Sequence, residues 1–148
     1  MSFWESLRIG ASGLTAQRLR LDLISNNIAN AQTTRTEKGG PYQRQDVVFM
    51  AEGSNPALPA PVAARRNSIG NLQGGVKASE IITDGTDGPR VYDPTHPDAD
   101  ANGYVNYPNV DIVVEMTNML SATRSYEANL ATVEAIKRMA LKALEIGK

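Results

Sequence analysis

Four residues near the middle of the chain have the types and spacing of a calcium-binding loop. The stretch PDADANGYVNY contains Asp98, Asp100, Asn102 and Gly103 in the order D-x-D-x-N-G. Oxygen-bearing side chains at alternate positions, followed by a glycine at position six, begin the loop of an EF-hand. One hypothesis is therefore a calcium-binding module centred on Asp98–Gly103.

The remainder of this stretch departs from the EF-hand pattern. If Asp98 is position one, position twelve is Asn109, and an amide cannot supply the bidentate carboxylate that completes the coordination shell. Prolines break the chain where an entering helix should lie. Asp and Asn side chains also bond their own backbone in turns, so the sequence favours a structural turn. In it Asp98 and Asn102 are expected to bond backbone amides, and Gly103 is expected to adopt a positive φ between Pro97 and Pro108. The residues of this predicted turn are Asp93, Pro94, His96, Pro97, Asp98, Asp100, Gly103 and Tyr104.

Residues for catalysis are scarce in the rest of the chain. His96 is the only histidine, and it lies between two prolines, where a solvated or backbone-bonded role is expected. The absence of cysteine excludes disulfides, zinc-thiolate sites and thiol nucleophiles. The Gly74-Gly75 pair lacks the Lys-Ser/Thr of a phosphate-binding loop. The sequence therefore predicts no enzyme, no cofactor and no metal.

Length and charge exclude further classes of partner. The chain has 148 residues, which suits one domain or a small domain with helical extensions. A formal net charge of −1, from 15 basic and 16 acidic residues, leaves no basic surface for nucleic acid or for a membrane. No apolar stretch approaches the roughly 20 residues that span a bilayer, and the start MSFWESLRIG is not a Sec signal peptide.

The predicted turn lies between two segments that are free to form helices. All eight prolines fall between Pro41 and Pro108, so only the two ends of the chain lack this helix breaker. The first helix begins with the capping box Ser2-x-x-Glu5 and is predicted to run to about Ala31. A heptad seam of apolar residues follows it: Leu7, Leu14, Leu21 and Ile28.

A second apolar stripe follows the same helix two residues out of phase with the seam. It consists of Ile9, Ala16 and Leu23, about 200° around the helix. One partner helix covers only one side. Since the chain has only two long helices, the second side is expected to be covered by another molecule.

The second predicted helix starts after Pro108, with Asn109 as its N-cap, and ends at Gly147. Its seam residues are Ile112, Met116, Met119, Tyr126, Leu130 and Val133. Between the two helices, strands are predicted at 42–50, 76–83 and 90–92, with a long loop at 53–75. The fold class is therefore α+β.

Three stretches of the sequence resemble one family of bacterial proteins. SGLTAQRLRLDLISNNIANAQTT (12–34) is similar to the N-terminal segment shared by flagellar rod, hook and hook-associated proteins. MLSATRSYEANLATVEAIKRMALKALEIG (119–147) is similar to their C-terminal helix. YDPTHPDADANGYVNYPNVDIVVEM (92–116) resembles the signature of the C-type subunit of the proximal rod.

This resemblance implies a structural role. The terminal segments 1–34 and 109–148 would pair in a coiled-coil-like inner domain, and 35–108 would form a small β-rich middle domain. Asn26, Asn27 and Asn30 would be polar motif positions between subunits. The protein would leave the cell through the flagellar type III export apparatus, without a cleaved signal peptide. It would assemble in the periplasm, as part of the basal body, into the hollow rod that transmits torque from the membrane ring to the hook.

The partners implied by the resemblance are further copies, homologous rod subunits, the adaptor proteins between ring and rod, and the export apparatus. No contact with nucleic acid and no membrane insertion are implied. Without the resemblance, the residues leave two other classes of protein open. They are an enzyme or metal-binding module at the turn, and a coiled-coil scaffold that remains in the cytoplasm.

Overall fold

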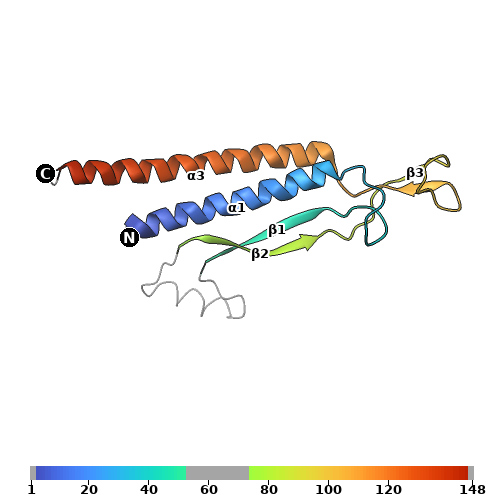
Figure 1. Ribbon diagram of the computed structural model, residues 1–148, viewed down its shortest axis with the longest axis horizontal. Coiled ribbons are helices and arrows are strands. Elements are labelled where there is room, and N and C mark those ends of the chain that lie inside the picture. Colours follow the sequence, from blue (N-terminus) through green and yellow to red (C-terminus); the bar gives the residue numbers. More distant parts are fainter. Residues whose placement is uncertain (1–2, 53–73, 147–148) are drawn as a thin grey trace. The chain divides into compact units, whose positions relative to one another are not determined.

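A computed structural model describes residues 3–52 and 74–146 (Figure 1). The predicted α+β class is confirmed, since one long helix precedes and another follows the strands along the chain. In order along the chain, the elements are α1 (Phe3–Ala29), β1 (Gln45–Ala51), β2 (Val76–Thr83), β3 (Arg90–Tyr92), β4 (Tyr104–Asn106) and α3 (Ile112–Ile146). Within the described ranges, neither helix is long and apolar enough to cross a membrane.

The described residues form two compact units, and both helices contribute to each unit. The first contains the described parts of Met1–Arg18, Val48–Glu80 and Arg124–Lys148, and the second contains Leu19–Val47 and Ile81–Thr123. The division into an inner domain of terminal helices and a separate middle domain stays a prediction. The loop predicted at 53–75 lies almost wholly outside the described residues, as does the predicted helix stop at Gly147.

The observed N-cap of α3 is Asp111 rather than the predicted Asn109. The Asp111 Oδ1 atom accepts hydrogen bonds from the backbone N–H groups of Val113 (2.8 Å) and Val114 (3.2 Å). These are donors that a helix N-terminus leaves without an intrahelical partner. The prediction was wrong because the Asn109 side chain accepts from the backbone N–H of Arg44 instead, at 2.9 Å.

Glycines allow α1 and α3 to approach closely in the first unit. A Cβ atom on Gly10 would lie 2.6 Å from Cγ2 of Val133, and one on Gly13 would lie 2.9 Å from Nδ2 of Asn129. Both distances are shorter than real Cβ contacts, so only glycine fits these positions without movement of the facing side chain.

The second apolar stripe of α1 is covered within the chain, so the expectation that another molecule must cover it was wrong. Ala16 is 3 % exposed and Leu23 is 9 % exposed. Beside the stripe, the Ser12 hydroxyl accepts from the backbone N–H of Val76 at 3.1 Å and donates to the Ile9 carbonyl at 2.7 Å. The hairpin of β1 and β2 therefore supplies a cover that helix periodicity alone could not reveal.

The described strands form two separate two-stranded sheets. In the first sheet β1 pairs with β2. The backbone bonds from Glu52 N to Gly75 O and from Asp84 N to Arg44 O, both 2.8 Å, show that these strands run antiparallel. The second sheet pairs β3 with β4 antiparallel, with Tyr92 opposite Tyr104.

The strand predictions were accurate for β2 and β3 and less so elsewhere. The predicted spans 76–83 and 90–92 match the observed bounds. The strand predicted from residue 42 begins only at Gln45. Strand β4 was not predicted, because its three residues belong to the stretch interpreted as a turn.

Candidate functional site: a buried polar cluster, a polar turn and an apolar helix face

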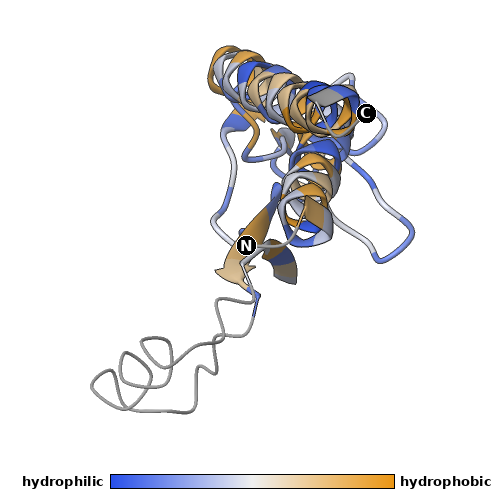
Figure 2. Ribbon diagram, turned by 90° about the vertical axis from the view of Figure 1, so that its left-hand side faces the viewer, coloured by the Kyte–Doolittle hydropathy of each residue, from blue (hydrophilic) through white to orange (hydrophobic). Residues whose placement is uncertain are grey.

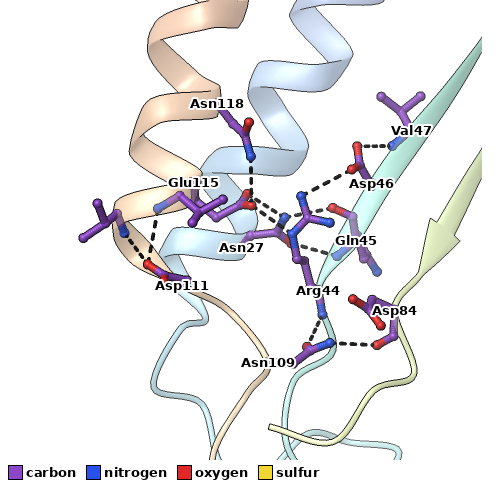
Figure 3. Close-up of polar contacts among 12 residues, drawn as sticks. Asn27, Arg44, Gln45, Asp46, Val47, Asp84, Asn109, Asp111, Glu115 and Asn118 are labelled. Atoms are coloured by element: carbon purple, nitrogen blue, oxygen red, sulfur yellow. Dashed lines mark hydrogen bonds and ion pairs between the residues drawn. The ribbon is translucent and has the colours of Figure 1, made fainter.

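The second unit encloses a group of bonded polar side chains, which we call the polar cluster (Figure 3). It consists of Asn27, Tyr42, Arg44, Asn109 and Glu115. Asn27 is 0 % exposed and Glu115 is 1 % exposed, whereas the other buried residues that the structure describes are apolar. A carboxylate this deeply buried is costly unless its charge and its lone pairs are matched.

Both oxygens of the Glu115 carboxylate are matched. Oε1 accepts from Nε of Arg44 at 2.9 Å, and Oε2 accepts from Nδ2 of Asn27 at 3.0 Å. The Arg44 side chain retains 24 % exposure, so its guanidinium reaches the buried carboxylate from the edge of the cluster. The ion pair is therefore asymmetric: the negative charge is fully enclosed and the positive charge is only partly so.

The Asn27 amide uses all of its hydrogen-bonding capacity. Nδ2 also donates to the Gln45 carbonyl at 2.8 Å, while Oδ1 accepts from Gln45 N–H (3.0 Å) and from the Tyr42 hydroxyl (2.8 Å). Burial raises the pKa of Tyr42, and the negative charge of Glu115 raises it further. The Tyr42 hydroxyl therefore remains a neutral donor, and the last turns of α1 are fixed to the start of β1.

Asn109 joins the segment before α3 to both strands of the first sheet. Its Oδ1 accepts from Arg44 N–H at 2.9 Å, and its Nδ2 donates to the Asp84 carbonyl at 3.2 Å. Arg44 lies directly before β1 and Asp84 directly after β2. The cluster thus connects the end of α1, the open end of the hairpin and the beginning of α3.

The three motif asparagines make bonds within the chain. Asn27 is enclosed in the cluster. Nδ2 of Asn30 donates to both the carbonyl and Oδ1 of Asn26, at 2.9 Å each, and its Oδ1 accepts from the Thr33 hydroxyl at 3.2 Å. These bonds close the C-terminal end of α1. A contact of Asn26 or Asn30 with another subunit stays a prediction.

The D-x-D-x-N-G stretch is a turn organised by Asp100. Its Oδ1 accepts from the backbone N–H groups of Asn102 (2.8 Å) and Tyr104 (3.0 Å), and its Oδ2 accepts from Arg90 at 2.8 Å. The prediction that Asp98 and Asn102 side chains bond the turn amides was wrong. Asp98 instead accepts from the Thr34 hydroxyl at 2.8 Å.

The carboxylates of this turn do not converge on a common point. Asp98 faces Thr34 and Arg35, whereas Asp100 faces its own turn and Arg90. Among the residues that the structure describes, no group of three or more His, Asp or Glu side chains could hold a metal ion. The calcium hypothesis is therefore not supported.

Other predicted features of the turn are confirmed. His96 Nδ1 accepts from the backbone N–H of Asp98 at 3.1 Å, so this histidine is backbone-bonded. Gly103 has φ +78°, the left-handed conformation that favours glycine. Tyr104 packs edge-on against Tyr92, with 5.3 Å between the ring centroids. The turn and the second sheet are therefore joined by hydrogen bonds and by the contact of these two rings.

Two substitutions separate the backbone role of the turn from its charge. A side chain at Gly103 would be strained at φ +78°, and its Cβ would lie 2.9 Å from the Tyr92 ring. We expect Gly103→Val to lower the thermal midpoint strongly, whereas Asp100→Asn should change it little, because the amide oxygen can still accept both backbone bonds. Thermal unfolding and motility of both variants, with and without added calcium, test this; rescue of Asp100→Asn by calcium would contradict a structural turn.

The lowered pKa values of three turn carboxylates predict that the protein loses stability in acid. Bonds from Thr86 and Thr95 lower the pKa of Asp84 and of Asp93, and backbone bonds from Tyr104 and Asn102 lower the pKa of Asp100. Because these pKa values lie below the ordinary value of 3.8, the folded state binds fewer protons than the unfolded state. The stabilisation is complete above about pH 4 and is lost as the pH falls through the folded values.

The measurement for this pH dependence is the thermal midpoint between neutral pH and pH 2. The wild-type chain should lose stability below pH 4, and the triple variant Asp84→Asn, Asp93→Asn, Asp100→Asn should show a flatter profile. Profiles of equal slope would show that other groups dominate the acid response.

The predicted seam of α3 divides between two faces of the helix. Met119, Tyr126 and Val133 are half-buried, in phase with the buried Glu115, whereas the remaining three seam residues point outward. These are Ile112, Met116 and Leu130, which are 42 %, 61 % and 42 % exposed. The predicted seam of α1 (Leu7, Leu14, Leu21 and Ile28) is half-buried throughout.

The exposed apolar residues at the start of α3 make up what we call the outer face. It consists of Val113, Met116 and Leu120, which are 73 %, 61 % and 54 % exposed. Their spacing of three and four places them on one side of the helix. In Figure 2 the ribbon of α3 is coloured for hydrophobic residues over much of its length, alternating with hydrophilic ones.

Sequence reasoning missed the inward polar residues Glu115 and Asn129. Together with Met119, Tyr126 and Val133 they recur at intervals of four and three or their sums along the inward side of α3. This spacing could have revealed them in the sequence. A carboxylate that falls on the buried side of a helix requires a hydrogen-bonding partner inside the fold.

Comparisons with known proteins place these features in a family. A family described as "Flagella basal body rod protein" matches residues 7–35. A second, described as "Flagellar basal body rod FlgEFG protein C-terminal", matches residues 101–146. The two matches include most of α1 and all of α3, and therefore Asn27 and Glu115 of the polar cluster, but only the end of the turn.

Curated relatives match along the whole chain. The flagellar basal-body rod protein FlgC of Bacillus subtilis is 45 % identical over 100 % of both chains. Those of Borreliella burgdorferi and Salmonella typhimurium are 44 % and 41 % identical, over 99 % and 95 % of this chain and 98 % and 94 % of the relatives. The chain therefore belongs to the FlgC family of flagellar basal-body rod proteins, which is a family of structural rod proteins.

Proposed function

We propose that the chain is a subunit of the proximal rod, which joins copies of itself and homologous rod subunits through its terminal helices. The observation that carries this is the apolar surface of α3 in a chain that belongs to a rod family. Val113, Met116 and Leu120 of the outer face are 73 %, 61 % and 54 % exposed. Single exposed apolar residues are common, whereas adjoining ones mark interaction sites.

The assembled rod would transmit torque from the membrane ring to the hook, and adaptor proteins would join it to the ring. The chain would reach the periplasm through the flagellar type III export apparatus. A chain without cysteine suits export in an extended state, since no disulfide can form before assembly. If the export apparatus is deleted, the chain should accumulate inside the cell; secretion by another route would contradict this part of the proposal.

Leu130→Asp tests the assembly surface. Leu130 is 42 % exposed in the single chain, so an aspartate there should leave the circular dichroism of the purified chain unchanged. In the rod it would place an unpaired carboxylate in an apolar contact, at a cost of several kcal/mol. We expect loss of rod assembly and of swimming, with secretion of the subunit retained.

The matched control is Ala128→Asp. Ala128 is exposed on the same helix and lies four residues after Arg124 and four before Thr132, on a polar side. This variant should swim normally. Normal swimming of Leu130→Asp, or an equal defect in both variants, would show that α3 does not use this apolar side for assembly.

A further inference from the structure

The polar cluster raises the question of why a carboxylate is enclosed between helices that could meet through apolar residues. Glu115 is 1 % exposed and Asn27 is 0 % exposed. Replacing a buried ion pair by well-packed apolar residues is often neutral for stability or favourable, so such a pair is weak evidence for a stabilising role. Buried polar groups do have a well-attested role in fixing the register of paired helices.

The apolar contacts between α1 and α3 favour the observed register only through steric fit. Gly10 and Gly13 admit Val133 and Asn129 at close range, and a shift of α3 by seven residues would place these two side chains against residues of α1 that carry a Cβ. The shift would still keep the same side of α3 toward α1, because the inward positions Met119, Tyr126 and Val133 repeat at the heptad spacing. Side chains can move to relieve such a steric cost, so these contacts do not by themselves exclude the shifted register.

The polar contacts are not repeated after such a shift. Seven residues after Glu115 the inward position is Ala122, which is 0 % exposed and has no side-chain acceptor. In the shifted pair Nδ2 of Asn27 would lose one acceptor, and the Arg44 guanidinium would lose its buried carboxylate. An unmatched buried polar group is costly, so only one register satisfies the cluster.

We propose that the Arg44–Glu115 ion pair, together with Asn27, fixes the register of α1 against α3. The register decides at which level along α1 the outward apolar residues of α3, Met116 and Leu130 among them, are presented. The link between the register and rod assembly rests on the proposed function. The role of the cluster in setting the register is independent of that function, and it is tested on the purified full-length chain.

Disulfide trapping reports the register, because the chain has no cysteine of its own. The in-register pair is Gly13→Cys with Asn129→Cys: a Cβ at residue 13 would lie 3.2 Å from Cγ of Asn129, a spacing suited to a disulfide. The out-of-register pairs combine Gly13→Cys with Ala122→Cys or with Ile136→Cys, seven residues earlier or later.

The test variant is the double substitution Arg44→Leu, Glu115→Leu. It removes both charges and leaves Asn27 bonded to Gln45 and Tyr42. The matched control is Arg8→Leu, Glu52→Leu, which removes an ion pair whose side chains are 46 % and 39 % exposed. Each cysteine pair is introduced into the wild-type, test and control backgrounds and then oxidised.

We expect only the in-register disulfide in the wild-type and control backgrounds. In the test background the helical circular dichroism should persist, the in-register yield should fall, and out-of-register disulfides should appear. An exclusively in-register disulfide in the test background would overturn the proposal. Loss of helical signal in the test background would overturn it as well, because the pair would then supply stability rather than register.

Swimming of cells that carry the double variant without cysteines is the separate readout for assembly. We expect loss of motility. Register mixing in the purified chain combined with normal swimming would leave the register proposal standing and would count against rod assembly through the outer side of α3.

Discussion

Glu115→Leu is expected to lower the free energy of unfolding by about 1–3 kcal/mol, mainly the cost of leaving a buried Asn27 donor without its acceptor. The substitution leaves the Arg44 guanidinium, whose side chain is 24 % exposed, without its carboxylate. It also removes the acceptor of one Asn27 N–H group, at a position where Asn27 is 0 % exposed. Leucine fills a similar volume, so the loss would come from unmatched polar groups and not from a cavity.

Urea unfolding of the purified chain, followed by helical circular dichroism, measures this effect. Glu127→Leu is the matched control, since it makes the same change at an exposed position of the same helix and should shift the free energy of unfolding by less than about 0.5 kcal/mol. Equal unfolding midpoints for the two variants would show that the buried cluster is not a determinant of stability.

Gly88→Ala is expected to cause a second large loss, through backbone overlap. A Cβ atom at residue 88 would overlap the carbonyl oxygen of Tyr107 and lie 2.6 Å from the carbonyl carbon of Pro108. Backbone atoms cannot rotate away as a flexible side chain can, so the segment that leads into α3 would have to move. Overpacking of this kind costs about 1–3 kcal/mol and occasionally more, and we expect the upper part of that range.

The neighbouring Gly85 offers a close control. A Cβ at Gly85 would meet nothing within 4 Å, and its φ lies outside the left-handed range. Gly85→Ala should therefore leave the thermal midpoint unchanged or raise it slightly, because alanine restricts the unfolded chain. If Gly88→Ala unfolds at the same temperature as Gly85→Ala, the close approach of residue 88 to the segment before α3 is not required for folding.

The local features of this fold could be predicted from sequence because their causes lie within a few residues. Strands β2 and β3 follow the alternation of side chains and the turn signals beside them, and Gly103 adopts the positive φ expected between two prolines. The helices follow apolar periodicity, with ends misplaced by two or three residues. Such ends depend on individual caps, as the competition between Asp111 and Asn109 shows.

The polar cluster could not be predicted, because its partners come from distant parts of the chain. Asn27 was predicted only as a family motif position, and Glu115 was not among the predicted site residues. Periodicity shows which side of a helix is apolar, but it does not show which strand will cover that side. The burial of Ala16 and Leu23 within the chain could not be predicted for the same reason, because the strands that cover them come from a distant part of the sequence.

The bond between Asn27 and Glu115 joins residues 88 positions apart, which has a consequence for the order of folding. Asp84, Asp93 and Asp100 bond to groups two residues away, and such short loops close within about 100 ns. The contact between α1 and the first turn of α3 encloses most of the chain, so its closure entropy is larger and its formation slower. A chain delivered through a channel from its N-terminus would therefore acquire its turns at once, and would remain unable to complete its core until residue 115 had emerged.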